Sequence, residues 1–193
     1  MSVLVLEERM ALLDLDKTTH WQPFYLDGKC YDLSHLDAHK VTYTQESDGK
    51  NPERSYDFYV TYSFHCFSKD YPTLTEQDRE KLKYSSDKES RPFCERRYLL
   101  SKKLPQIING LHKSNLVFHA GHESYATCNI EDENGNKIEY YVSFATYRYK
   151  KKLRIHIQSA YPLDTPLGKR KKVKFFTIAY NLFNGKALPA PQK

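Results

Sequence analysis

The strand-like segment from Leu153 to Tyr161 carries the side chains best suited to chemistry. Arg154 and His156 are two residues apart, so on a strand they share one face, about 7 Å from each other. In RNA cleavage, an imidazole can remove the proton of a 2′-hydroxyl while a guanidinium stabilises the charge that develops on the phosphate. The pair therefore predicts metal-free phosphodiester cleavage. The alternative is an exposed sheet face with ordinary cross-strand pairs.

Two further residues complete the predicted catalytic set. Arg148 lies on the neighbouring strand, and Tyr161 lies at the end of the same strand as His156. Tyr161 and Ser159 have the opposite parity to Arg154 and His156. A β-bulge, or the end of the strand near Pro162, is therefore needed to bring them onto the same face.

Basic residues are concentrated in the last third of the chain. Residues 141–193 contain 12 of the 30 Lys and Arg residues but one of the 24 acids, a net charge of +11, whereas residues 1–140 have a net charge of −5. A positive field focused on an ordered sheet favours a polyanion, and we expect RNA rather than DNA as the partner. The alternative is that these lysines only keep a sheet edge soluble. The residues predicted to bind nucleic acid lie in or beside two turns: Lys150, Lys151, Lys152, Lys169, Arg170, Lys171 and Lys172.

The sequence does not indicate a nucleotide-cofactor site or a metal site. No glycine-rich phosphate loop and no nucleophile elbow is present, so ATP or dinucleotide chemistry is not expected, and we expect no cofactor. The pairs His35/His39 and His119/His122 could contribute to a zinc site, but no cysteine or carboxylate completes a recognisable spacing. We therefore expect no metal.

The hydrophobic pattern predicts the elements that position these residues. Residues 54–66 alternate strictly between apolar and polar, which is typical of an antiparallel strand with one wet side. Between Glu95 and His112 the apolar residues follow a helical period, and Pro105 predicts a kink. Further strands are expected at 30–34, 40–44, 117–119, 124–130, 138–149, 153–161 and 173–182. The fold class is α+β: an antiparallel meander with one kinked central helix packed on it.

One principal domain is expected. Residues 1–27 are an N-terminal arm or short helix, residues 28–186 form a single α+β domain, and residues 187–193 are a tail. No apolar run is long enough to cross a membrane, and the N-terminus lacks the features of a secretory signal. The four cysteines are widely spaced, so we expect reduced thiols in a cytoplasmic protein without a membrane partner.

Part of the chain resembles known protein families. The order of a helix containing Leu104-Pro-Gln-Ile-Ile, hairpin strands, the segment Lys152-Leu-Arg-Ile-His-Ile-Gln-Ser-Ala-Tyr-Pro and a final basic–aromatic strand is similar to barnase/RelE-like toxin nucleases. The likeness covers residues 98–185 and implies a four-stranded antiparallel sheet whose polar face cuts RNA without metal. It also implies phosphate contacts from Arg148 and Arg154, acid or base catalysis by His156, and roles for Ser159 and Tyr161. The long β region before the helix departs from those small toxins. From Cys30 to Lys186 the chain also resembles an uncharacterised bacterial protein family.

These observations favour a bacterial or phage-encoded nucleic-acid-binding protein, with metal-independent endoribonuclease activity of a toxin or phage-defence type as the sharper hypothesis. The alternative is a non-enzymatic binding module, a defence or anti-defence factor that contacts nucleic acid or an acidic protein. A third interpretation is a structural subunit whose tyrosine-rich faces are buried in an oligomer.

Overall fold

The computed structural model describes residues 19–50, 52–86, 89–113, 117–121, 124–127, 130–131, 137–165, 167–168 and 170–189. Lys169, His122, most of the predicted N-terminal arm and the end of the predicted tail lie outside the described residues. Within them, no helix is long and apolar enough to cross a membrane.

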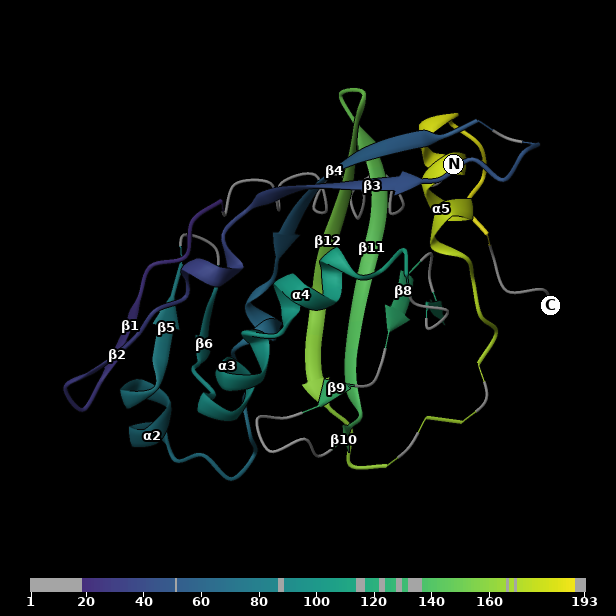
Figure 1. The fold of residues 1–193 in the computed structure, drawn as a ribbon. Helices are drawn as coiled ribbons and strands as arrows, with labels where there is room; N and C mark the ends of the chain where they lie inside the picture. The colour runs from purple at the N-terminus through teal and green to yellow at the C-terminus, as the bar shows by residue number, and fades with distance from the viewer. Residues whose placement is uncertain are drawn as a thin grey trace, which may run out of the picture.

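A six-stranded mixed sheet forms the centre of the molecule (Figure 1). All neighbouring strands are antiparallel except β4 and β12, which run parallel with Leu153 opposite Phe58 and Ile157 opposite Tyr62. The predicted α+β class with mostly antiparallel strands is therefore confirmed, although the parallel pair interrupts the meander. In spatial order the strands are β3 (His39–Gln45), β4 (Arg54–Tyr62), β12 (Lys152–Pro162), β11 (Tyr140–Tyr149), β8 (Ser124–Thr127) and β7 (Phe118–Gly121).

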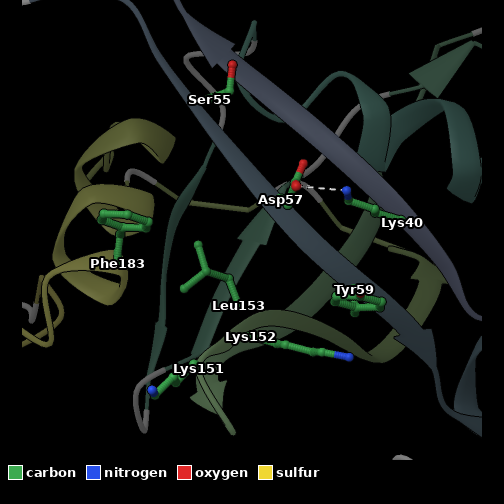
Figure 2. Close-up of a pocket in the computed structure, with 8 residues that line it drawn as sticks. All are labelled: Lys40, Ser55, Asp57, Tyr59, Lys151, Lys152, Leu153 and Phe183. Carbon is green, nitrogen blue, oxygen red and sulfur yellow. Dashed lines mark ion pairs between the residues drawn. The ribbon is translucent and has the colours of Figure 1, made fainter.

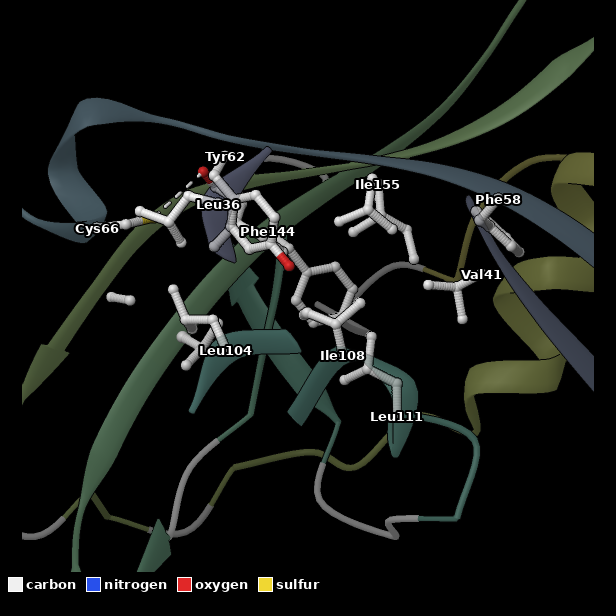
Figure 3. Packing of buried hydrophobic residues seen from close by; sticks show 14 of the residues in the cluster. Leu36, Val41, Phe58, Tyr62, Cys66, Leu104, Ile108, Leu111, Phe144 and Ile155 are labelled. Atoms are coloured by element: carbon white, nitrogen blue, oxygen red, sulfur yellow. Dashed lines mark hydrogen bonds between the residues drawn. The ribbon is translucent and has the colours of Figure 1, made fainter. Parts of the chain in front are cut away.

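One face of the sheet is apolar and carries the principal core. The predicted kinked helix is present as α3 (Glu95–Ser101) and α4 (Leu104–Asn109), with Pro105 in the first turn of α4. Leu104 and Ile108 of α4 pack with Phe58, Phe144 and Ile155 of the sheet (Figure 3). The hydroxyl of Tyr43 on β3 donates a 2.7 Å hydrogen bond to the carbonyl oxygen of Ile108, which ties α4 to the same face.

The core continues beyond the end of β4 as a group of aromatic side chains. Trp21 and Phe24 of the predicted arm are buried there, and Trp21 packs edge-on against Phe64 and Phe67, so aromatic side chains anchor this segment. The elements around the cluster are small: β1 (Phe24–Leu26), β2 (Lys29–Tyr31), the 3-10 turns Ser34–Leu36 and Phe64–Cys66, α2 (Glu76–Lys81), β5 (Lys83–Ser85) and β6 (Ser90–Pro92). A short pair, β9 (Ile130–Glu131) and β10 (Lys137–Ile138), lies below the main sheet (Figure 1).

Two predicted strands differ from the structure. The segment predicted as a strand over 173–182 is instead the helix α5 (Phe175–Phe183), and its residues Phe175, Ile178, Ala179 and Leu182 are buried at helical spacing. The long strand predicted over 54–66 ends at Tyr62, because the hydroxyl of Ser63 accepts the backbone N–H of His65 at 3.0 Å and starts a 3-10 turn.

The predicted faces of β4 are largely confirmed. Tyr56, Phe58, Val60 and Tyr62 are buried, whereas Ser55 and Asp57 are exposed. Thr61 is the exception: it was expected on the exposed side but is only 5% exposed. The reason is its central position beside β12, where it hydrogen-bonds to His156.

Candidate nucleic-acid interface

The second face of the sheet is polar, and a bulge in β12 determines which residues share it. Ser143 of β11 is paired with Ser159, but the next residue, Phe144, is paired with Ile157, so Gln158 is an extra residue in β12. An extra residue in a strand moves the side chains that follow it to the opposite face from the one that strict alternation would give them. Ser159 and Tyr161 therefore lie on the same face as Arg154 and His156. This is the arrangement for which the sequence pattern required a bulge.

His156 is nevertheless buried within this face. It is 2% exposed, and its Nδ1 lies 2.9 Å from the Thr61 hydroxyl, with which it forms a hydrogen bond. Burial, with a smaller contribution from the nearby His65, lowers the pKa of His156 to about 4. The imidazole is therefore neutral near pH 7 and has no direct path to a substrate from solvent in this structure.

Two other residues of the predicted catalytic set, Arg148 and Tyr161, are also held by structural contacts. Arg148 is paired with Leu153, on the opposite face from Arg154, and its Nη1 donates a 3.1 Å hydrogen bond to the carbonyl of Phe183 at the end of α5. The ring of Tyr161 lies 5.3 Å from the Arg97 guanidinium, which donates to two backbone carbonyls. The structure therefore does not gather Arg148, His156 and Tyr161 around one reacting phosphate.

Cations and tyrosine rings alternate at the turn end of the polar face. Lys152 Nζ lies 4.8 Å from the ring centre of Tyr59, and Arg154 Cζ lies 5.7 Å from that ring and 5.6 Å from the Tyr149 ring. Lys150 Nζ lies 5.1 Å from the Tyr149 ring. All four distances are within the range of cation–π attraction. We call Tyr59, Tyr149, Lys150, Lys152 and Arg154 the cation–tyrosine ladder.

The turn beside the ladder has an unusual backbone. Lys150 and Lys151 are the two central residues between the paired Tyr149 and Lys152, and both have positive φ angles, 47° and 63°. A two-residue hairpin turn of this kind prefers Asn-Gly, and an L-residue in the left-handed region costs about 1–2 kcal/mol. The sequence thus places two lysines at positions where asparagine and glycine would be more stable.

A pocket of about 330 Å³ opens next to the ladder (Figure 2). Lys151 and Lys152 lie on one side and Tyr59 on another, while Phe183 of α5 faces them across the pocket. Its lining contains one carboxylate, Asp57, whose charge is balanced by Lys40 at 2.7 Å. Lys40 and the hydroxyl of Thr42 lower the pKa of Asp57, so the carboxylate stays ionised and paired.

The second predicted basic cluster lies elsewhere. The segment that carries Lys171 and Lys172 runs beside β7, where the N–H of His119 donates to the carbonyl of Lys171 at 3.3 Å and Phe118 forms a bridge with Lys172. Counting strand positions from there to Tyr149 gives a separation of roughly 20 Å along the strands and roughly 14 Å across them. The two clusters, the second of which includes Arg170, therefore do not converge on one site.

Sequence reasoning missed Tyr59, Lys40 and Phe183. They come from β4, β3 and α5, and only contacts between distant parts of the chain bring these elements together near the β11–β12 turn. Strict alternation did show that Tyr59 lies on the wet side of its strand, which was the one available signal. In the described part of the chain, no three His, Cys, Asp or Glu side chains gather in a way that could hold a metal ion. His35 instead contacts the Ser101 hydroxyl at 2.8 Å.

The fold and this face define the molecule as an α+β protein with a mixed sheet, one side covered by helices and the other lined by tyrosine and basic residues. The chain belongs to the YjaZ family, whose model matches residues 23–183. It is 49% identical over 175 residues to Protein YjaZ of Escherichia coli (strain K12), an alignment that covers 90% of this chain and 96% of that protein. No solved structure matches the chain.

The family match confirms the expected resemblance to an uncharacterised bacterial family. The family match gives no link to the barnase- or RelE-like toxin nucleases. The likeness of residues 98–185 to those nucleases therefore stays a prediction.

Proposed function

We propose that this protein binds RNA through the cation–tyrosine ladder without cleaving it. The observation that carries the proposal is the alternation of three cations with two tyrosine rings beside a strained lysine turn. Basic side chains contact the phosphates of a nucleic acid, and aromatic rings stack on its bases. Tyr59, which is 36% exposed, offers such a ring.

Binding is preferred to catalysis because of His156. Its burial, its hydrogen bond to Thr61 and its lowered pKa fit a residue that stabilises the interior of the sheet. General acid–base catalysis needs a group within hydrogen-bond reach of the substrate and a pKa near the working pH. His156 meets neither requirement in this structure.

Fluorescence anisotropy with a short labelled oligoribonucleotide tests binding. We expect the affinity to fall as salt rises, with a slope of about 0.7 in log–log form for each phosphate neutralised on a single strand. Replacing Lys152 by Gln and Tyr59 by Leu together should weaken binding by at least tenfold. The matched control is Lys102→Gln, which removes a lysine that lies 4.9 Å from the ring of Tyr98, away from the ladder.

Affinity that does not change with salt, or an equal loss in the control, would contradict the proposal. The same RNA incubated with the protein in EDTA should be recovered intact. Cleavage that disappears in His156→Ala while the protein stays folded would establish the ribonuclease hypothesis instead. Parallel titrations with RNA and DNA of one sequence measure the expected preference for RNA.

A further inference from the structure

The pocket beside the ladder continues into a second one. This neighbouring pocket, of about 400 Å³, lies between the start of β4 and the end of α5, and both pockets are lined by Ser55 and Phe183. Each volume falls in the range of roughly 300–1,000 Å³ that is usual for small-molecule sites. We call the two together the β4–α5 groove.

The groove exists because β4 begins before β12 does. Arg54 to Asp57 are paired with β3, but the pairing of β4 with β12 starts only at Phe58 and Leu153. In the described part of the chain, no strand is paired with residues 54–57 along the edge that faces away from β3. The β11–β12 turn and the last residues of α5 border the space left there.

Cations lie at both ends of the groove. Lys151 and Lys152 line one end. At the other end the Tyr180 ring has Arg54 Cζ 5.3 Å from its centre and Lys186 Nζ 3.5 Å from its hydroxyl. Lys186 first, and Arg54 second, lower the pKa of the Tyr180 phenol, as expected where the local potential is positive.

An exposed aromatic ring lies between these cations. Phe183 is 57% exposed, and its ring packs nearly perpendicular to the ring of Tyr56, with 5.9 Å between the ring centres. An apolar ring between two groups of cations suits a nucleotide whose base is unpaired, because stacking needs a free base face while the phosphates on either side need positive charge. A duplex keeps its base faces covered and could use only the cations.

We infer that the β4–α5 groove binds single-stranded RNA, with an unpaired base stacked on Phe183 and the flanking phosphates on Lys151 and Lys152 at one end and on Arg54 and Lys186 at the other. This inference rests on the proposed function and specifies the form of RNA that the protein takes.

The test compares a single-stranded oligoribonucleotide containing 2-aminopurine with the same strand in a duplex. For the wild-type protein we expect tighter binding of the single strand and a change in 2-aminopurine fluorescence on stacking. Phe183→Ala should lose about 5- to 150-fold in affinity for the single strand, the measured range for one stacked base, and little for the duplex. The matched control is Leu99→Ala, a similarly exposed apolar residue on α3 (51%) outside the groove.

Each result has a definite meaning. If wild-type protein binds no RNA, both the proposed function and this inference fail. If it binds with the expected salt dependence but Phe183→Ala equals the wild type, the groove inference alone is overturned. Displacement of the RNA by poly-glutamate at equal charge concentration would also overturn it, in favour of an acidic protein partner. Phe183→Leu, checked by urea unfolding, separates loss of stacking from loss of folding.

Discussion

The lysine turn between β11 and β12 gives the sharpest prediction, because stability and binding should change in opposite directions. Replacing Lys150 by Asn and Lys151 by Gly supplies the residues that the positive φ angles of 47° and 63° favour. Relief of about 1–2 kcal/mol at Lys151 is offset by the entropy of glycine, roughly 0.5–1 kcal/mol, and Asn adds a smaller gain. The net stabilisation is about 1 kcal/mol.

For a chain of this length, that gain corresponds to a rise in Tm of about 2–4 °C, measurable by thermal unfolding. The same variant loses two positive charges beside the ladder. Its affinity for single-stranded RNA should therefore fall, and the slope of log affinity against log salt should decrease by about 0.7 for each lysine that contacts phosphate.

The control variant carries Gln at both positions. It removes the charges but leaves L-residues in the left-handed region, so it should lose the same affinity while Tm stays near the wild-type value. A Tm of the Asn-Gly variant at or below that of the wild type would refute the strain argument. Unchanged RNA affinity in both variants would refute the assignment of this turn to the interface.

Two further predictions concern stability. The pKa of His156 is about 4 when folded and about 6.5 when unfolded. As pH falls from 7.5 to 5, the unfolded state therefore takes up a proton that the native state does not, and this residue should lower the free energy of unfolding by about 2 kcal/mol. Urea unfolding at the two pH values should show a smaller decrease in the free energy of unfolding for His156→Gln than for the wild type. An equal decrease in both proteins would count against a buried neutral imidazole. Tyr43→Phe removes the 2.7 Å hydrogen bond to the carbonyl of Ile108, which still accepts the Leu111 N–H at 3.2 Å, and should cost about 0.5–1.5 kcal/mol. Tyr140→Phe removes a buried hydroxyl that has no hydrogen-bond partner among the described residues, and it should be neutral or stabilising in the same assay.

Local patterns in the sequence were enough for several elements. The alternation over 54–62 identified β4 and its faces, and the helical period with Pro105 identified the bend between α3 and α4. These patterns succeed because each reflects which side of one element meets the core. The same logic was available at α5, where residues 175, 178, 179 and 182 have helical spacing. The many aromatic and β-branched residues there favoured the wrong assignment of a strand, because propensity is a weak guide when burial decides.

The interface depended on contacts that no local pattern contains. The parallel pairing of β4 with β12 joins residues almost a hundred positions apart, and it alone brings Tyr59 beside Arg154 and Lys152. The same pairing buries His156 against Thr61 and makes a residue with catalytic potential part of the interior. The sequence by itself thus determined which residues carry charge and which faces are wet. Tertiary structure decided which of them meet, because strand pairing depends on the whole chain and side-chain periodicity depends only on neighbours.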